Sequence, residues 1–108
     1  MPPHDAVLVL TTVPDDDHAD TLARVLVEER LAACVSVQAP MGSTYRWKGT
    51  VESSRERQVV IKTVRALVPA LATRLGALHP YELPEFLVLD VEGGEAYLRW
   101  IGDAVQSA

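Results

Sequence analysis

The sequence lacks several features that mark particular classes of protein. It has a single cysteine, Cys34, so it cannot form an intramolecular disulfide, and a reduced cytoplasmic setting is expected. No stretch reaches the ~20 apolar residues that a membrane-spanning helix needs. Residues 1–5 do not combine a basic segment with a following apolar one, so no secretory signal is expected. These absences predict a cytoplasmic protein without a membrane partner.

Positive charge is also scarce. The chain carries 15 acidic and 10 basic residues, which gives a formal net charge of −5. Nucleic-acid-binding proteins usually gather lysine and arginine on one face to neutralise phosphates. Here Arg55, Arg57 and Arg65 are scattered rather than clustered. We therefore expect no nucleic-acid partner, whereas an acidic surface is compatible with bound cations.

Catalytic signatures are missing as well. No serine or cysteine nucleophile lies in a recognisable constellation, and no paired-carboxylate or metal-hydrolase motif occurs. A glycine-rich phosphate-binding loop is also absent. The sequence therefore does not predict an enzyme.

The residues that are present predict a single domain over 1–108. A β-branched run over 7–13 indicates a buried strand that Pro14 ends. Acidic residues 15–17 favour a helix start, and Leu22, Ala23 and Leu26 then follow at the spacing of one helical face.

Two strands and a turn are expected next. The first strand runs over about 33–47, with an interruption near 40–42 that indicates a bend or bulge. Lys48 and Gly49 favour a tight turn, and the return strand continues to about Val64.

The last third predicts a helix over 66–78, a strand over 85–91 and a final helix. An apolar stripe on that final helix makes Trp100 the expected core anchor; the stripe consists of Tyr97, Trp100, Ile101 and Ala104. The order β-α-β-β-α-β plus a C-terminal helix predicts an α+β, ferredoxin-like sandwich, with an antiparallel sheet and both main helices on one face.

The central hairpin is long for a monomer. Each arm has about fourteen residues, or ~45 Å at ~3.3 Å per residue, whereas a domain of this size has a radius of gyration of ~13 Å. Strands that project this far leave unpaired edges, which another subunit's sheet would cover, so a closed homo-oligomer is expected. The alternative is that a bend at Pro40 folds the hairpin back on itself.

Five sequence blocks resemble the CutA family of divalent-cation-tolerance proteins. The blocks are Leu31-Ala32-Ala33-Cys34-Val35, Tyr45-Arg46-Trp47-Lys48-Gly49, Val60-Ile61-Lys62-Thr63, His79-Pro80-Tyr81-Glu82-Leu83-Pro84-Glu85 and Tyr97-Leu98-Arg99-Trp100-Ile101. They occur in order and cover about 7–104. The resemblance implies a ferredoxin-like subunit in a tight homotrimer, a response to metal ions and, for some members, copper binding.

The resemblance also implies where copper would bind, and this sequence departs from it. Family members associated with copper use a first-strand cysteine and two adjacent histidines before Pro-Tyr. Here those positions are Thr11, Leu78 and His79. His79 is thus the one candidate metal ligand retained, and one imidazole in each subunit is a weak pattern for a soft metal.

A further group of polar and aromatic residues allows two interpretations. Lys62 lies in an apolar strand and should need a carboxylate, for which Glu56, Glu82 and Glu85 are candidates. The group could be an ion-pair network that fixes the register of a trimer, or a cleft between subunits that binds a small anionic molecule. The group comprises Trp47, Glu56, Lys62, His79, Tyr81 and Glu82. Cys34 is expected to be buried and inert.

Three hypotheses for function follow. The protein could bind a divalent cation such as copper at subunit junctions through His79. It could instead be a PII-like regulatory trimer that holds a small anionic ligand in the clefts between subunits. The third hypothesis is a trimeric scaffold that presents surfaces to a protein partner.

Overall fold

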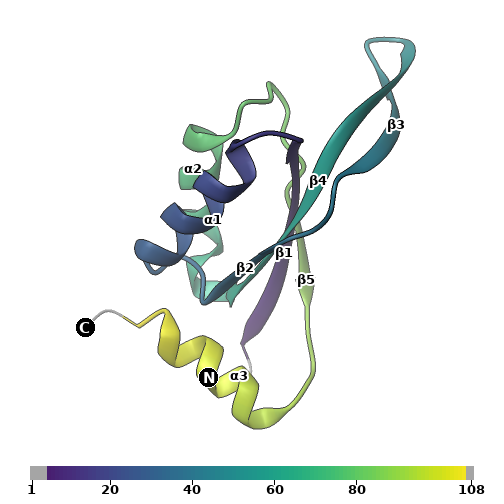
Figure 1. Cartoon of the computed structure of the whole chain (residues 1–108). Coiled ribbons are helices and arrows are strands. Elements are labelled where there is room, and N and C mark those ends of the chain that lie inside the picture. The colour runs from purple at the N-terminus through teal and green to yellow at the C-terminus, as the bar shows by residue number, and fades with distance from the viewer. Residues whose placement is uncertain (1–4, 107–108) are drawn as a thin grey trace.

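The computed structural model describes residues 5–106, and its elements follow the expected order (Figure 1). The strands are β1 (Ala6–Pro14), β2 (Cys34–Val37), β3 (Met41–Trp47), β4 (Thr50–Val64) and β5 (Leu87–Asp90). The helices are α1 (His18–Glu28), α2 (Val68–Leu78), which follows the 3-10 turn η1 (Arg65–Leu67), and α3 (Glu95–Ala104). The strands form one antiparallel sheet in the order β2-β4-β1-β5, with β3 paired to β4. This is the predicted mixed α+β arrangement.

Helices α1 and α2 cover one face of this sheet (Figure 1). Alternate residues of the two central strands point toward them, because side chains along a strand alternate between faces. The resulting core buries Val7 and Val9 from β1, Val59 and Ile61 from β4, and Leu75 from α2 to 1% exposure or less. Burying an aliphatic side chain of this size stabilises the fold by about 1.5–3 kcal/mol. We refer to this side of the sheet as the covered face.

The opposite side of the sheet, which we term the open face, is largely uncovered within the chain. Helix α3 covers only one end of it, where Leu98 and Ile101 pack against Ala6. The strand register places five further aliphatic residues on this face; they are Leu8, Leu10, Val60, Leu87 and Leu89. Of these, Leu87 is 53% and Leu89 45% exposed.

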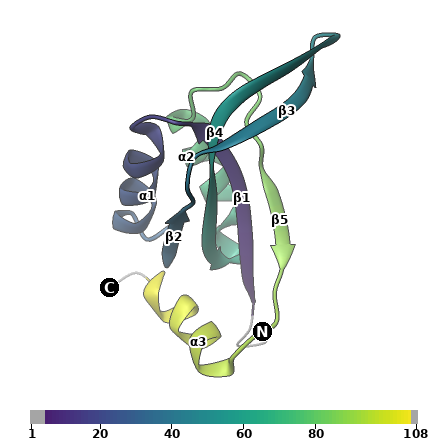
Figure 2. The same cartoon turned by 45° about the vertical axis from the view of Figure 1, so that its right-hand side comes forward.

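The hairpin of β3 and β4 projects from the body of the protein (Figures 1 and 2). Its turn has positive φ at Lys48 (49°) and Gly49 (81°), as a two-residue type I′ connection requires. The first arm is broken because residues 38–40 face only residues 57 and 58 of β4, which makes a bulge slightly earlier than predicted. The chain extends 45 Å along its longest axis and 25 and 24 Å across, so the bulge does not fold the hairpin back.

The final helix differs from its prediction. Its buried residues are Leu98 and Ile101, whereas Trp100 is 45% and Tyr97 47% exposed, so Trp100 as a core anchor was wrong. The physical reason is that the helix turns Leu98 and Ile101 toward the sheet, where they pack with Ala6, Ala33, Val64 and Val91, and this orientation leaves Trp100 outside the contact. No helix within residues 5–106 is long and apolar enough to cross a membrane.

Candidate functional site

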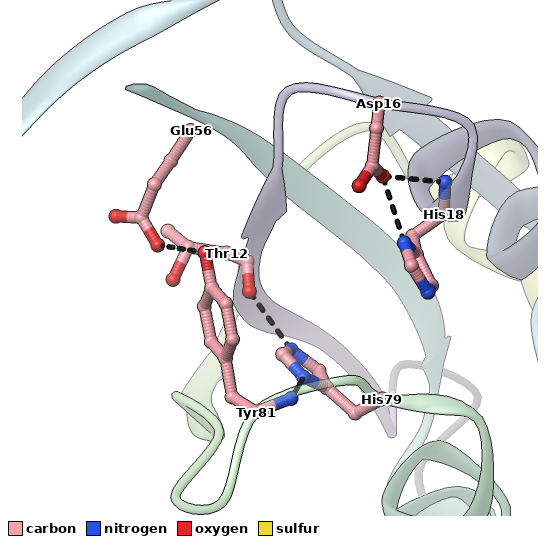
Figure 3. A network of polar contacts seen from close by, with 6 residues as sticks. All are labelled: Thr12, Asp16, His18, Glu56, His79 and Tyr81. Atoms are coloured by element: carbon pink, nitrogen blue, oxygen red, sulfur yellow. Dashed lines mark hydrogen bonds and ion pairs between the residues drawn. The ribbon is translucent and has the colours of Figure 1, made fainter. Parts of the chain in front are cut away.

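Three of the predicted polar residues, Glu56, His79 and Tyr81, lie together at the base of the hairpin, where β1 ends and the 79–85 loop begins (Figure 3). Helix α2 ends at Leu78 because Pro80 disfavours a helical conformation in the preceding residue. His79 accordingly has extended backbone angles, φ −79° and ψ 136°, and its amide still donates to the Leu75 carbonyl at 2.8 Å. This geometry directs the chain from the helix end across the end of β1.

His79 is 9% exposed and is bonded through both ring nitrogens. Its Nε2 lies 2.8 Å from the Thr12 carbonyl oxygen and 3.2 Å from Thr11 Oγ1. Because a carbonyl only accepts, Nε2 carries the hydrogen, and Nδ1 then accepts the Tyr81 backbone N–H at 3.1 Å. Burial lowers the pKa of His79, which favours the neutral ring that these bonds require.

Tyr81 extends the network to a buried carboxylate. Its hydroxyl donates to Glu56 Oε2 at 2.7 Å, and its ring lies 5.0 Å from that of His79, centroid to centroid. Burial, and then this hydrogen bond, raise the pKa of Tyr81 well above its usual range. Glu56 is only 7% exposed, yet none of the ion pairs formed within residues 5–106 includes it.

The 79–85 loop is held at its far end as well. Gln58 Nε2 donates both to the Thr11 carbonyl at 2.7 Å and to Glu85 Oε2 at 2.9 Å. In the middle of the loop, Glu82 Oε2 lies 3.7 Å from the Nζ of Lys48 in the hairpin turn. The loop is therefore fixed at both ends to the strands and touches the hairpin at its centre.

A groove of about 1130 Å³ opens between the hairpin and this loop. Its charged lining is acidic, with four carboxylates (Glu52, Glu56, Glu82 and Glu85) and two guanidinium groups (Arg46 and Arg55). Three aromatic side chains also line it; they are Tyr45, Trp47 and Tyr81. This balance of charge suits a positively charged ligand better than the anionic molecule that one hypothesis requires.

The structure separates the residues that were predicted to act together. Trp47, Glu56, Tyr81 and Glu82 line the groove, whereas His79 is absent from its lining. The predicted cleft combining Lys62, His79 and Tyr81 is therefore not formed within the subunit.

Lys62 does not meet the predicted carboxylate. It lies at the other end of β4, where its Nζ donates to the Tyr97 hydroxyl at 3.2 Å and stands 5.4 Å from that ring's centroid. Within the subunit, the half-buried ammonium contacts a phenol and an aromatic face instead, and a carboxylate from a neighbouring subunit stays a prediction. Its cross-strand partner Cys34 is half-buried rather than buried, and Cys34 Sγ lies 3.9 Å from Ser36 Oγ.

The residues at the resemblance's copper positions do not form a complete metal site in one subunit. The side chains of Thr11 and His79 are in contact, but Thr11 offers a hydroxyl, which is a poor ligand for copper. The side chain of Leu78 packs against the core. In the part of the chain that the structure describes, no three His, Cys, Asp or Glu side chains are grouped to hold a metal. A metal at His79 would therefore need donors from outside the subunit.

Comparisons with known proteins agree with the fold. The model of the family described as CutA1 divalent ion tolerance protein matches residues 7–104. The divalent-cation tolerance proteins CutA of Thermus thermophilus and Pectobacterium atrosepticum are each 45% identical; the alignments cover 87% and 94% of this chain and 92% and 94% of those proteins. The crystal structure of CutA from Xylella fastidiosa superposes with a TM-score of 0.91 at 47% identity, covering 94% of this chain and 99% of that one. These names describe tolerance of divalent cations and no reaction.

Proposed function

Because the chain belongs to the CutA1 divalent ion tolerance family, we propose that it serves divalent-cation tolerance as a homotrimer that binds a cation such as copper where subunits meet. The observation that carries this proposal is the incompleteness of the single subunit. Its sheet exposes aliphatic side chains on the open face, and within residues 5–106 its one retained metal-ligand candidate, His79, is not grouped with further metal ligands. Association of several copies would bury the exposed aliphatic side chains and could bring further ligands to His79.

The trimer follows from the open face and the hairpin. Leu87 and Leu89 expose aliphatic surface whose burial contributes roughly 25 cal/mol for each Å². On β4, pairing with β1 ends at Glu56, so within the described range 5–106 one edge of residues 50–55 has no partner strand. A closed ring of subunits would cover the apolar surface and these edges together.

The metal site rests on His79 and requires a local rearrangement. The Nδ1 lone pair is the one the neutral ring can offer to a metal, and the Tyr81 N–H now occupies it. Coordination would replace that hydrogen bond, and further ligands would come from a neighbouring subunit. Imidazole suits copper and zinc, so these are the cations to test.

Titration calorimetry with copper and with zinc tests this proposal on wild type, His79→Ala and His18→Ala. His18 is a matched control because it is a half-exposed histidine at the start of α1, bonded to Asp16. We expect a saturable site with a simple ratio of metal to trimer, lost in His79→Ala and retained in His18→Ala.

Weak, unsaturable binding in all three proteins, or a saturable site that survives His79→Ala, would contradict the metal site. Light scattering and circular dichroism on each variant establish that it remains assembled and folded. The variant His79→Gln keeps a side-chain N–H donor for the Thr12 carbonyl, so it separates loss of a ligand from loss of structure.

A further inference from the structure

Glu56 marks the point where β4 passes from the body of the sheet into the hairpin. It pairs with Pro14 at the end of β1 and with Met41 at the start of β3. Beyond it, within the described residues 5–106, positions 50–55 of β4 pair only with β3 (Figures 1 and 2). Because an isolated two-stranded ribbon is only marginally stable in water, contacts at Glu56 have a large influence on the direction in which the hairpin projects.

Tyr81 holds the side chain of Glu56 at this point. Its hydroxyl donates to Glu56 Oε2 at 2.7 Å, and Glu56 is buried already within the subunit (Figure 3). A hydrogen bond to a carboxylate is shorter and stronger than one between neutral groups. Both partners belong to the same chain, so association of subunits can bury this bond further but is not needed to form it. The bond can therefore order the hairpin before subunits meet.

Tyr81 is in turn fixed to the end of β1. Its backbone N–H donates to His79 Nδ1 at 3.1 Å, and His79 Nε2 donates to the Thr12 carbonyl at 2.8 Å. Between them Pro80 has a backbone φ that its ring fixes, which limits the ways in which the connection can move. The phenol therefore has a defined position relative to β1, and its bond to Glu56 transmits that position to the hairpin.

Two ion pairs also join the hairpin to the body of the protein, and both are weaker than this bond. Arg55 Nε lies 3.6 Å from Asp15 Oδ2, and Lys48 Nζ lies 3.7 Å from Glu82 Oε2. The side chains of Arg55, Lys48 and Glu82 are at least 70% exposed. Exposed ion pairs contribute little, because water and salt screen them. The buried bond at Glu56 is therefore the contact that should decide the orientation of the hairpin.

We propose that the hydrogen bond between Tyr81 and Glu56 sets the direction of the hairpin in the free subunit and so prepares it to pack against a second copy of the chain. This inference rests on the trimer of the proposed function and gives Tyr81 a positioning role in its assembly. An apparent dissociation constant rises as the inverse of the population that is competent to bind. Three hairpins enter each trimer, so a threefold loss of that population in each subunit would raise the trimer dissociation constant about 27-fold.

The test is the trimer dissociation constant by sedimentation equilibrium, in EDTA and in a fixed sub-denaturing concentration of urea that brings dissociation into range. Tyr81→Phe keeps the ring and removes the hydroxyl, and it should raise the constant on the order of tenfold or more. Tyr97→Phe is the matched control, because it removes the same group and its bond to Lys62 at the other end of β4. It should leave the constant nearly unchanged. No rise in Tyr81→Phe, or an equal rise in both variants, would overturn the proposal.

The rate of dissociation separates positioning from direct contact between subunits. Native mass spectrometry measures it from the exchange of subunits between ¹⁵N-labelled and unlabelled trimers. A positioning residue acts in the free subunit, so Tyr81→Phe should slow association and leave the dissociation rate nearly unchanged. Loss of a contact across an interface acts mainly on dissociation. Faster dissociation that accounts for the whole rise in the constant would therefore place the Tyr81 hydroxyl against the neighbouring subunit and overturn its positioning role.

A double-mutant cycle tests whether Tyr81 acts through Glu56. Glu56→Met removes the acceptor, and combining it with Tyr81→Phe leaves neither partner of the bond buried and unpaired, which favours folding. In the Glu56→Met background, Tyr81→Phe should add little to the dissociation constant. A full effect of Tyr81→Phe in that background would overturn the proposal. A monomeric wild type would contradict the proposed function as well, whereas a trimeric wild type that is insensitive to Tyr81→Phe would contradict this inference alone.

Discussion

The two faces of the sheet contain similar aliphatic residues but differ in what covers them. Val9 and Ile61 on the covered face have 0% exposure beneath α1 and α2, whereas Leu87 and Leu89 on the open face remain about half exposed. Both sets come from the same sheet, since neighbouring residues along each of its strands alternate between the two faces. From this difference we infer that helices α1 and α2 of the chain cover one face. We propose that further copies of the chain cover the other face.

The largest expected effect lies on the covered face. Leu75→Ala removes a 1% exposed side chain beneath the sheet and should lower the free energy of unfolding by about 2–5 kcal/mol, because a cavity remains. Urea denaturation followed by circular dichroism measures it. Leu83→Ala is the control, since Leu83 is 70% exposed and its loss should change stability by ~0.5 kcal/mol or less. Similar losses in both variants would contradict the assignment of the core.

The matching change on the open face should affect assembly instead of folding. Leu89→Asp places a charge where we propose that subunits pack, and Leu89 is 45% exposed within its own subunit. We expect the trimer to dissociate while the far-ultraviolet circular dichroism stays native-like. Light scattering gives the mass, and a variant that remains fully assembled would show that the open face is not the junction.

The pH dependence of stability tests the hydrogen-bond network of His79, Tyr81 and Glu56 at the base of the hairpin. Burial lowers the pKa of His79 in the folded state below its usual value near 6.5. The unfolded chain therefore binds the proton more readily, so the stability due to His79 is complete above pH ~6.5 and is lost as the pH falls through the folded pKa. Unfolding in urea at a series of pH values should show this decline in wild type, and a smaller decline in His79→Gln. An equal decline in both proteins would mean that titratable groups other than His79 cause the loss of stability.

The smallest effects come from two glycines outside both faces. Gly49→Ala introduces a side chain at φ 81° and should destabilise the hairpin by about 1–2 kcal/mol. Gly76→Ala lies within α2, where an added Cβ meets nothing within 4 Å, and should stabilise the protein by ~0.5–1 kcal/mol. Thermal unfolding of both variants checks the opposite signs. A gain in Gly49→Ala would contradict the turn assignment.

The fold could be predicted because the apolar residues of most elements recur with the period of one regular structure, either the strand or the helix. Along β4, the alternate residues Val59, Ile61 and Thr63 are all buried, as the period of two in a strand implies for residues that share one face. Helix α3 was mispredicted because Ile101 belongs to two possible stripes, one with Trp100 and one with Leu98. The choice between them depends on the shape of the surface beneath the helix, which lies far away in the sequence.

The candidate site was harder to predict than the fold. The short loop between Pro80 and Pro84 brought Tyr81 near the strands, but only the structure identifies Glu56 as its partner. An ammonium among apolar residues predicts a counter-charge for Lys62, whereas the hydrogen-bond partner that the subunit itself supplies is Tyr97 on α3. Sequence patterns report the kind of partner a side chain needs, whereas long-range packing decides which residue provides it.

The most direct test of this account is the mass of the wild-type protein by sedimentation equilibrium, measured across a range of protein concentrations. The account predicts a single species of three times the 11.8 kDa chain mass, because the open face and the hairpin edges are completed by neighbouring copies. A stable monomer of 11.8 kDa would contradict it, since the half-exposed Leu87 and Leu89 would then need no partner and no subunit junction would exist to hold a metal.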